Sequence, residues 1–402
     1  MTLAFTLRTP LDAEPRDFSI ILGGPLFQLL RRAHISGDAL ELARRRVVVI
    51  ALFAWLPLLV LCIASGDAFG GSAAVPFIKD VQVHVRFLVA MPLLIVAELV
   101  VHTRLRPVAF EFLTRGLVPA DAIGKFQEKL VAAMRLRNSV AAEVLMIVAV
   151  YTIGVPIVWR EVGALDVTTW YAVASEGRVK LTLPGIWYAY VSVPLFQFLM
   201  LRWYFRLVVW MRFLWGVSRI RLDLHAMHGD RMAGLGFLNA TVFAFLPLAM
   251  AHGALVAGTI ANRIFYAGQA LADSRYEIAI VVAFLLLLVL GPLIVFAPQV
   301  ARAKREAARV FGRLSQRYVR EFEATWLPDG SPATASPLGT GDIQSLADLS
   351  NSFETLRATR VVPITRDSVL GLAIATLAPV APLLVTVIPA EELAKRLLTL
   401  IL

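Results

Sequence analysis

Residues 44–66 read RRRVVVIALFAWLPLLVLCIASG. Three arginines stand before a run, residues 47–66, that contains no charged side chain. About 20 such residues in a helix cross roughly 30 Å of hydrocarbon, because each residue adds about 1.5 Å of rise. The stretch therefore predicts a transmembrane helix with its arginines at the membrane boundary.

The rest of the chain extends this pattern. Its 402 residues are 58% hydrophobic and 17% charged, and the mean hydropathy is +0.72. A soluble domain holds about 45–50% apolar residues, so the composition indicates an all-α, polytopic transmembrane helical bundle. By apolar length and flanking charge we place seven spans, at residues 47–66, 85–103, 139–159, 185–209, 236–261, 277–298 and 368–388.

The basic residues set the expected topology. They gather before span one and after spans two and six, whereas the connections near 67–80, 160–183 and 263–276 hold few of them. The positive-inside rule then puts the N-terminus in the cytoplasm and, after an odd number of spans, the C-terminus outside. This topology signal accounts for the net charge of +10, so no nucleic-acid partner is expected. The single cysteine, Cys62, excludes a disulfide within the chain.

Four segments follow from these spans. The first carries an amphipathic helix, expected on the membrane surface at 18–30. The last carries Pro379 and Pro382, which kink or break its span, so that it either crosses the membrane or re-enters it. The expected boundaries are 1–46 for a cytoplasmic N-terminal segment with its interfacial helix, 47–298 for a core of six spans including a cytoplasmic helix at 120–138, 299–366 for a cytoplasmic helical extension with a flexible loop, and 367–402 for the last span with an outer interfacial helix.

Two cytoplasmic segments show helical periodicity. Apolar residues recur at spacings of three and four in 120–138 and in 300–326. We expect the two stripes to pack into one small cytoplasmic layer; the alternative is a surface that forms a homo-oligomer. The stripes consist of Ile123, Phe126, Leu130 and Met134 in the first segment and of Ala307, Phe311, Leu314, Tyr318 and Phe322 in the second.

Residues 225–237, HAMHGDRMAGLGF, allow three interpretations. His225, His228 and Asp230 are weak candidates for a metal site, because no cysteine lies nearby and the spacing matches no HExxH motif. A phosphate loop would need a preceding strand and a lysine. We favour the start of span five, with Asp230 as the N-cap of the helix. No metal or cofactor is therefore expected.

Span five also carries a stripe of small residues. Such residues let helix backbones approach closely in a membrane, so we predict that span five is the most deeply buried helix. The stripe consists of Ala240, Ala244, Pro247, Ala251, Ala254 and Gly258.

Three stretches are similar to a known family. HGDRMAGLGFL at 228–238, DIQSLADLSNSFETLRATRVVPIT at 342–365 and LAPVAPLLVTVIPAEEL at 377–393 resemble a family of uncharacterised bacterial multi-pass inner-membrane proteins. The resemblance covers most of the chain from FSIILGGPLF at 18–27 onward. Members often carry proline after the motif histidine, where this chain has Gly229. The resemblance implies a location in the bacterial inner membrane, and it implies no particular activity.

Burying an ionisable side chain inside a membrane span costs free energy, so such residues suggest a function. Glu98, Glu143 and Arg202 fall at a similar depth, in the cytoplasmic third of the bilayer, and Arg206 lies one turn beyond Arg202. They form either a buried ion-pair network that fixes helix register or the lining of an inner vestibule or proton relay. A third alternative, above all for Arg206, is extension of the side chain to the headgroups.

Two histidines lie toward the expected outer side. His84 stands at the start of span two, and His252 interrupts the outer half of span five. A buried histidine is usually a satisfied hydrogen-bonding group, but one that faces water could carry a proton or sense pH. Aromatic residues near the expected boundaries are predicted to belong to the aromatic belts. They are Trp159, Trp170, Trp187 and Tyr188 on the outer side and Trp210 and Trp215 on the inner side.

Three functions are compatible with this sequence. The first is a channel or transporter that moves a proton or a monovalent cation between spans two to five, past Glu98, Glu143, Arg202 and His252. The second is a sensor or assembly scaffold that binds a partner protein through its cytoplasmic helices. The third is an intramembrane enzyme, which is disfavoured because no nucleophile–base pair stands out. The lipid bilayer is a partner in every case.

Overall fold

The computed structural model describes residues 18–24, 28, 43–71, 73–157, 169–175, 178–327 and 341–386. Within these ranges seven helical stretches are long and apolar enough to cross a membrane, which confirms the all-α polytopic bundle. Spans one to seven cover Arg44–Ser65, Val81–Thr114, Val140–Ile157, Leu183–Val217, Gly236–Ala267, Leu271–Trp326 and Arg366–Thr386.

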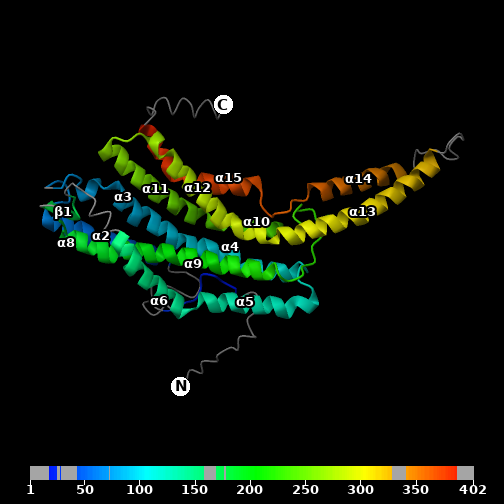
Figure 1. Ribbon diagram of the computed structural model, residues 1–402, viewed down its shortest axis with the longest axis horizontal. Helices are drawn as coiled ribbons and strands as arrows, with labels where there is room; N and C mark the ends of the chain where they lie inside the picture. The colour runs from blue at the N-terminus through cyan, green and yellow to red at the C-terminus, as the bar shows by residue number, and fades with distance from the viewer. Residues whose placement is uncertain are drawn as a thin grey trace, which may run out of the picture.

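The spans are α-helices joined end to end with short π-helical and 3-10 segments (Figure 1). The α-helices are α2 (Ala43–Ser65), α3 (Val81–His84), α4 (Met91–Thr114), α5 (Ile123–Arg137), α6 (Val140–Ala149), α8 (Leu183–Trp187), α9 (Val193–Val217), α10 (Gly236–Ala240), α11 (Leu246–Ala267), α12 (Arg275–Leu290), α13 (Ala297–Trp326), α14 (Asp342–Ala358) and α15 (Arg366–Leu377). The π-helical segments are η4 (Val85–Ala90), η6 (Val150–Gly154) and η7 (Tyr188–Ser192), and the 3-10 segments are η3 (Phe77–Lys79), η5 (Ala120–Ala122), η8 (Thr241–Phe245), η9 (Leu271–Ser274), η10 (Gly291–Phe296) and η11 (Ala378–Thr386).

Proline explains the π-helical segments. Each of the three ends two residues before a proline, namely Pro92, Pro156 or Pro194. Proline has no amide hydrogen and its ring crowds the carbonyl one turn earlier, so the turn before it widens. The carbonyl of Tyr190, four residues before Pro194, accepts a hydrogen bond from the Tyr151 hydroxyl at 3.1 Å instead. The turn before Pro194 therefore links the backbone of span four to the Tyr151 side chain of span three.

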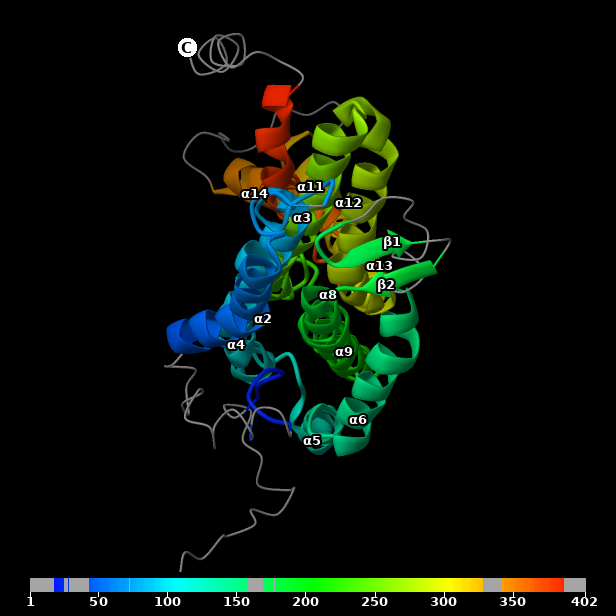
Figure 2. The same ribbon diagram turned by 90° about the vertical axis from the view of Figure 1, so that its left-hand side faces the viewer.

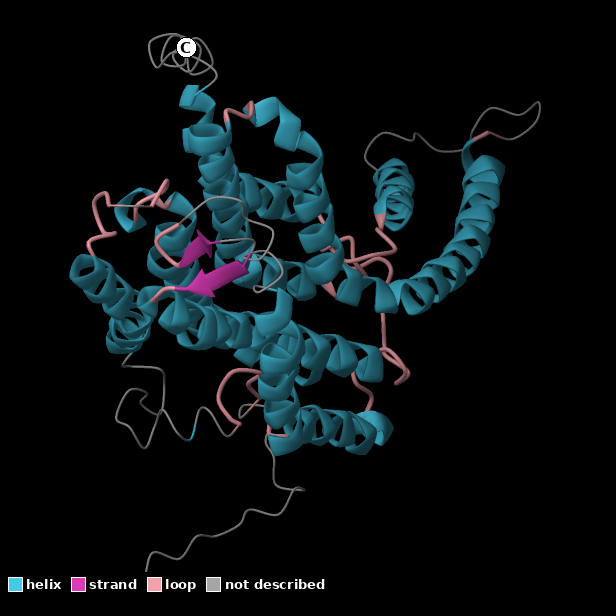
Figure 3. Ribbon diagram, turned by 60° about the vertical axis from the view of Figure 1, so that its left-hand side comes forward, coloured by secondary structure: helices cyan, strands magenta, loops and turns pink. Residues whose placement is uncertain are grey.

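The bundle has two chemically different ends. One carries the antiparallel hairpin of β1 (Ala172–Ser175) and β2 (Arg178–Leu181), in which Ala172 pairs with Leu181. We call it the hairpin end, and Figure 2 views the bundle from that side. The other end carries α5, the loop 218–235 and the arginine-rich α13, and we call it the basic end. The hairpin is a departure from the helices that the sequence predicts, and it is the one sheet among the described residues (Figure 3).

A buried aspartate stabilises the hairpin end through hydrogen bonds. Asp80 accepts hydrogen bonds from the indole of Trp170 at 2.9 Å and from the side-chain amide of Asn262 at 2.8 Å. Trp170 is fully buried, so its assignment to an aromatic belt is wrong. Trp210 is 1% exposed and lies in the core, so its assignment to a belt is wrong as well. Both indoles pack against other rings inside the protein rather than against lipid headgroups.

Span five has the largest buried fraction of the seven spans, as the sequence predicts. Its backbone approaches span seven so closely that a Cβ added to Gly253 would lie 1.9 Å from the carbonyl oxygen of Thr376. Ala244, Ala251 and Ala254 of the predicted stripe are buried, whereas Ala240 is exposed at the basic end. Small residues therefore allow spans five and seven to pack in direct backbone contact.

The two apolar stripes that the sequence assigns to the cytoplasm do not form one layer. α5 packs along α9, where the ring of Phe126 contacts Phe112 and Phe213 with centroids about 6 Å apart. α13 continues span six out of the bundle and packs along α14, on the other side of α9 (Figure 1). The prediction of a shared layer is therefore wrong. The predicted flexible loop, apart from Leu327 and Gly341, and the predicted C-terminal interfacial helix lie outside the described residues.

Candidate functional site

A carboxylate inside the bundle forms ion pairs with arginines from two other helices. Glu98 of α4 accepts hydrogen bonds from Arg46 of α2 at Oε2 and from Arg206 of α9 at Oε1, the latter at 2.7 Å. Arg202, one turn earlier on α9, has its Nη1 3.7 Å from the same Oε1. All four side chains are buried. One carboxylate thus ties together spans one, two and four.

The network continues to span three. The Nε atom of Arg202 lies 3.7 Å from Oε1 of Glu143, a buried residue in the first turn of α6. The structure therefore brings together Glu98, Glu143, Arg202 and Arg206, the residues that the sequence puts at one depth. Arg206 is 4% exposed and paired, so its extension to the headgroups is excluded.

Positive charge exceeds negative charge in this cluster. Arg137, the last residue of α5, extends toward the same region, where burial and then the charge of Arg206 lower the pKa of its guanidinium to about 10. It remains protonated at neutral pH. Among the described residues, the region thus holds four guanidiniums and two carboxylates, and three of the guanidiniums, those of Arg46, Arg202 and Arg206, are paired with Glu98 or Glu143. We call Arg46, Glu98, Arg137, Glu143, Arg202 and Arg206 the charge cluster.

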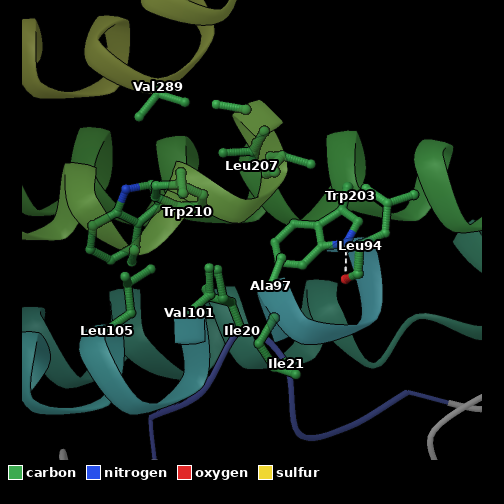
Figure 4. Close-up of a cluster of buried hydrophobic side chains, with 14 of the residues drawn as sticks. Ile20, Ile21, Leu94, Ala97, Val101, Leu105, Trp203, Leu207, Trp210 and Val289 are labelled. Carbon is green, nitrogen blue, oxygen red and sulfur yellow. Dashed lines mark hydrogen bonds between the residues drawn. The ribbon is translucent and has the colours of Figure 1, made fainter. Parts of the chain in front are cut away.

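A stretch near the N-terminus covers the charge cluster. Residues 18–24, FSIILGG, bend into the bundle without helical structure and bury Phe18, Ile20 and Ile21. Figure 4 shows Ile20 and Ile21 directed into the apolar layer between α4 and α9. The surface helix predicted at 18–30 is therefore wrong for these residues, and most of 25–30 lies outside the described residues. Gly23 and Gly24, both with positive φ, explain the irregular backbone.

Polar contacts hold this covering segment, residues 18–24, in place. Ser19 Oγ lies 2.9 Å from His102 Nδ1, and the carbonyl oxygen of Ser19 accepts a hydrogen bond from Arg137. The amide of Gly24 donates to Asn138 Oδ1 at 3.0 Å. A Cβ added to Gly24 would lie 2.8 Å from Glu143 Oε1. The segment therefore lies directly against the charge cluster, and its positive φ at Gly24 favours glycine there.

His252 lies apart from the charge cluster. Its Nδ1 is 2.8 Å from the carbonyl oxygen of Leu248, so this nitrogen carries the hydrogen, and its Nε2 accepts from the hydroxyl of Tyr204 at 2.9 Å. The ring is buried and packs near Tyr204 and Phe284. Both ring nitrogens are satisfied in a neutral imidazole, which links spans four and five.

His84 occupies a third position, at the hairpin end. Trp55 of span one donates its indole hydrogen to Nδ1 of His84 at 2.9 Å, so Nε2 carries the proton and donates to the Ile78 carbonyl oxygen at 3.1 Å. The ring of Phe77 contacts it edge to face. His84 therefore joins span one to the connection before span two, far along the chain from His252.

The stretch 225–235 is a loop rather than the first turn of span five. The carboxylate of Asp230 accepts hydrogen bonds from the amides of Met232 at 2.8 Å, Gly234 at 3.2 Å and Gly236 at 2.8 Å. Burial would raise the pKa of Asp230, but these amides and the neighbouring His228 outweigh it, so the pKa lies below its usual value. The carboxylate of Asp230 thus accepts a hydrogen bond from the amide of the first residue of α10, six positions later. Asp230 is therefore not a simple N-cap.

The weak metal candidates do not converge. His228 Nδ1 lies 3.0 Å from Asp230 Oδ1, but His225 is exposed and its nearest carboxylate oxygen belongs to Asp223, at 3.7 Å. The described residues contain no group of three or more His, Cys, Asp or Glu side chains that could hold a metal ion.

Sequence reasoning missed Arg46 and the covering segment. Arg46 is the last of three consecutive arginines, and the pattern assigns all three to the membrane boundary. The helix α2 is apolar on every side, so no periodicity in the sequence marks the face on which Arg46 is buried. Nothing local marks Ser19 or Gly24, because their partners lie more than 80 residues away.

Comparison of the chain with protein-family models, curated proteins and solved structures finds no match. The geometry of the chain's own residues therefore carries the functional argument.

Proposed function

We propose that the protein moves a small ion across the membrane through spans two to five, and that the charge cluster forms the ion site at the basic end of this path. The supporting observation is that Arg46, Glu98, Arg202 and Arg206 are all buried within membrane-spanning helices. Ionisable groups at such positions are costly, and they commonly mark ion pathways. A network that only fixes helix register is the structural alternative.

The charge balance selects the kind of ion. The sequence alone favours a proton or a monovalent cation, since Glu98 and Glu143 stand out there. In the structure, both carboxylates are held by arginines, and the described part of the cluster keeps an excess of positive charge. A buried positive excess repels cations and is compensated by an anion. We therefore favour a small monovalent anion such as chloride over a proton or a cation.

The covering segment closes the path in this conformation. Ile20 and Ile21 fill the apolar layer between α4 and α9. The ring of Phe18 contacts Trp210 and Phe213 of α9, and Gly24 lies against Glu143. An ion would reach the cluster from the basic end only after this segment withdraws. Such a withdrawal breaks the polar contacts of Ser19 with His102 and Arg137 and of Gly24 with Asn138.

The orientation follows from the charges. We propose that the basic end faces the cytoplasm, because the loops and helices there carry most of the arginines. The resemblance of the motifs at 228–238, 342–365 and 377–393 to bacterial multi-pass proteins supports the inner membrane as the location.

The test is a survey of ion flux in proteoliposomes that contain the purified protein. Gradients of chloride, potassium, sodium and protons are imposed in turn, with empty liposomes as the control. We expect chloride flux to exceed potassium and sodium flux. Cation or proton flux without chloride flux would overturn the anion assignment. The absence of flux for every ion would mean that the charge cluster has a structural role only.

A second candidate function is a scaffold for a partner protein. The observation that favours it is the projection formed by α13 and α14, which leaves the bundle at the basic end (Figure 1). Val310 and Leu314, one turn apart on α13, are 46% and 42% exposed there. Their replacement by serine should abolish cross-linking to a partner while flux stays unchanged. Unchanged cross-linking would count against this function.

A further inference from the structure

A groove of about 1930 Å³ opens at the basic end between α9, α12, η10, α13 and the loop 218–235. Its lining divides into two parts along the direction of the spans. One part is apolar and consists of lipid-accessible side chains of the membrane-spanning helices. The other is polar and begins where spans four and six end. The groove therefore crosses the boundary between hydrocarbon and water.

The apolar part faces the hydrocarbon. Leu287 of α12 is 71% exposed, and Ile294 of η10 and Trp215 of α9 are about half exposed. Exposed apolar side chains on a membrane-spanning helix contact lipid tails. Nothing in the described protein covers these side chains, so an acyl chain can lie along them.

The polar part is rich in arginine. Arg219 and Arg221 follow α9, and Arg302, Arg305 and Arg309 lie on one side of α13. The acidic lining residues are Asp121, Asp223 and Glu306, of which Glu306 lies 4.0 Å from Arg309 and Asp223 lies 3.7 Å from His225. Within the described ranges, no carboxylate lies within 4.0 Å of the guanidiniums of Arg219, Arg221, Arg302 or Arg305. The groove thus has a surplus of unpaired positive charge.

One side chain joins the two parts. The guanidinium of Arg219 lies over the ring of Trp215, 5.0 Å from its centroid. This stacking holds a cation at the depth where an indole lies in a membrane interface. Phospholipid phosphates lie at that depth too, and arginine binds phosphate through two parallel hydrogen bonds.

We infer that the groove binds an anionic phospholipid, with its phosphate among Arg219, Arg302 and Arg305 and an acyl chain along Leu287 and Ile294. A soluble anion such as inorganic phosphate would use the arginines but not the apolar part. The lipid uses both, and the bilayer supplies it at high local concentration. This inference rests on the membrane-spanning fold and not on the proposed ion transport.

The test measures binding of a fluorescent phosphatidylglycerol to the delipidated protein in detergent micelles, with phosphatidylcholine as the neutral comparison. The variant is Arg302→Gln with Arg305→Gln, and the matched control is Arg313→Gln with Arg320→Gln, two exposed arginines of α13 outside the groove lining. Both double variants remove the same charge from one helix. Their thermal midpoints are compared first, so that loss of binding is not loss of fold.

We expect the wild type and the control to prefer phosphatidylglycerol and the groove variant to bind it about 25-fold more weakly, since one basic residue near anionic lipid contributes about fivefold. Equal losses of lipid binding in the two double variants would mean that general surface charge causes the effect, and this would overturn the site. Equal binding of the two lipids by the wild type would overturn it as well. Displacement of the lipid by millimolar inorganic phosphate would identify a soluble anion as the ligand and would also contradict the inference.

Discussion

Arg206 donates a hydrogen bond to Glu98 at 2.7 Å, and this pair joins spans two and four within the membrane-spanning part of the chain. The second carboxylate oxygen of Glu98 accepts from Arg46 of span one. Glu98 is therefore the common partner of three helices, and its contacts decide both how the bundle holds together and how the charge cluster is balanced.

Replacement of Glu98 by glutamine should lower stability sharply. The change leaves buried guanidiniums without a charged partner, which typically costs about 3–5 kcal/mol. The readout is the thermal unfolding midpoint of the purified protein in detergent. Glu111→Gln is the matched control, because Glu111 forms an exposed pair with Arg115, and such pairs contribute about 0–1 kcal/mol. Equal shifts for the two variants would contradict the account.

Replacement of Gly24 by alanine should displace the covering segment. Gly24 has a φ of +87°, and its added Cβ would collide with Glu143. Gly66→Ala is a close control, since Gly66 has a φ of +82° and an added Cβ meets nothing within 4 Å. Both variants carry the same backbone strain, of about 1 kcal/mol. If the segment closes the ion path, only Gly24→Ala raises ion flux in proteoliposomes. Equal ion flux in the two variants would contradict the proposal that the segment closes the ion path.

Replacement of Gly253 by alanine should separate spans five and seven. The added Cβ would lie 1.9 Å from a backbone oxygen of Thr376, and neither backbone can yield without moving its helix. Gly312→Ala on α13 meets nothing within 4 Å and should stabilise its helix by about 0.5–1 kcal/mol. Thermal midpoints measured side by side should therefore shift in opposite directions. A Gly253→Ala protein as stable as the wild type would refute the close packing of these spans.

Replacement of Asp230 by asparagine should destabilise the loop 225–235 in a pH-dependent way. The folded protein holds the pKa of Asp230 below its usual value, so the carboxylate stabilises the fold above the ordinary pKa of about 3.9. That contribution is lost as pH falls through the lower folded pKa. The midpoint difference between wild type and variant should be constant near neutral pH and shrink at acid pH. Asp223→Asn, at an exposed carboxylate, is the control, and a difference that grows toward acid pH would be incompatible with the assignment.

The sequence predicts the spans well because each depends on local composition. Runs of apolar residues locate all seven, and the small residues of span five predict its burial. Shared depth also predicts that Glu98, Glu143 and Arg202 can meet, since residues at one level of a bundle lie near one another.

Other features depend on partners distant in the chain. The residues 18–24 are apolar enough for a surface helix, but Gly23 and Gly24 turn them into the bundle, where α4 and α9 offer a gap that no local pattern shows. Trp170 and Trp210 lie at plausible belt positions, yet Asp80 and neighbouring rings draw them into the core. Asp230 is a favourable N-cap type, but the left-handed backbone at Arg231 and Ala233 delays the helix to Gly236.

The most direct test of the proposed ion site is chloride flux in proteoliposomes that contain Arg202→Gln. This change lowers the positive excess of the charge cluster, while Glu98 keeps Arg46 and Arg206 as partners. Arg212→Gln, an exposed arginine on the same helix, is the control. The account predicts that chloride flux falls for Arg202→Gln and is unchanged for Arg212→Gln, with both proteins folded. Unchanged chloride flux in a folded Arg202→Gln protein would contradict it.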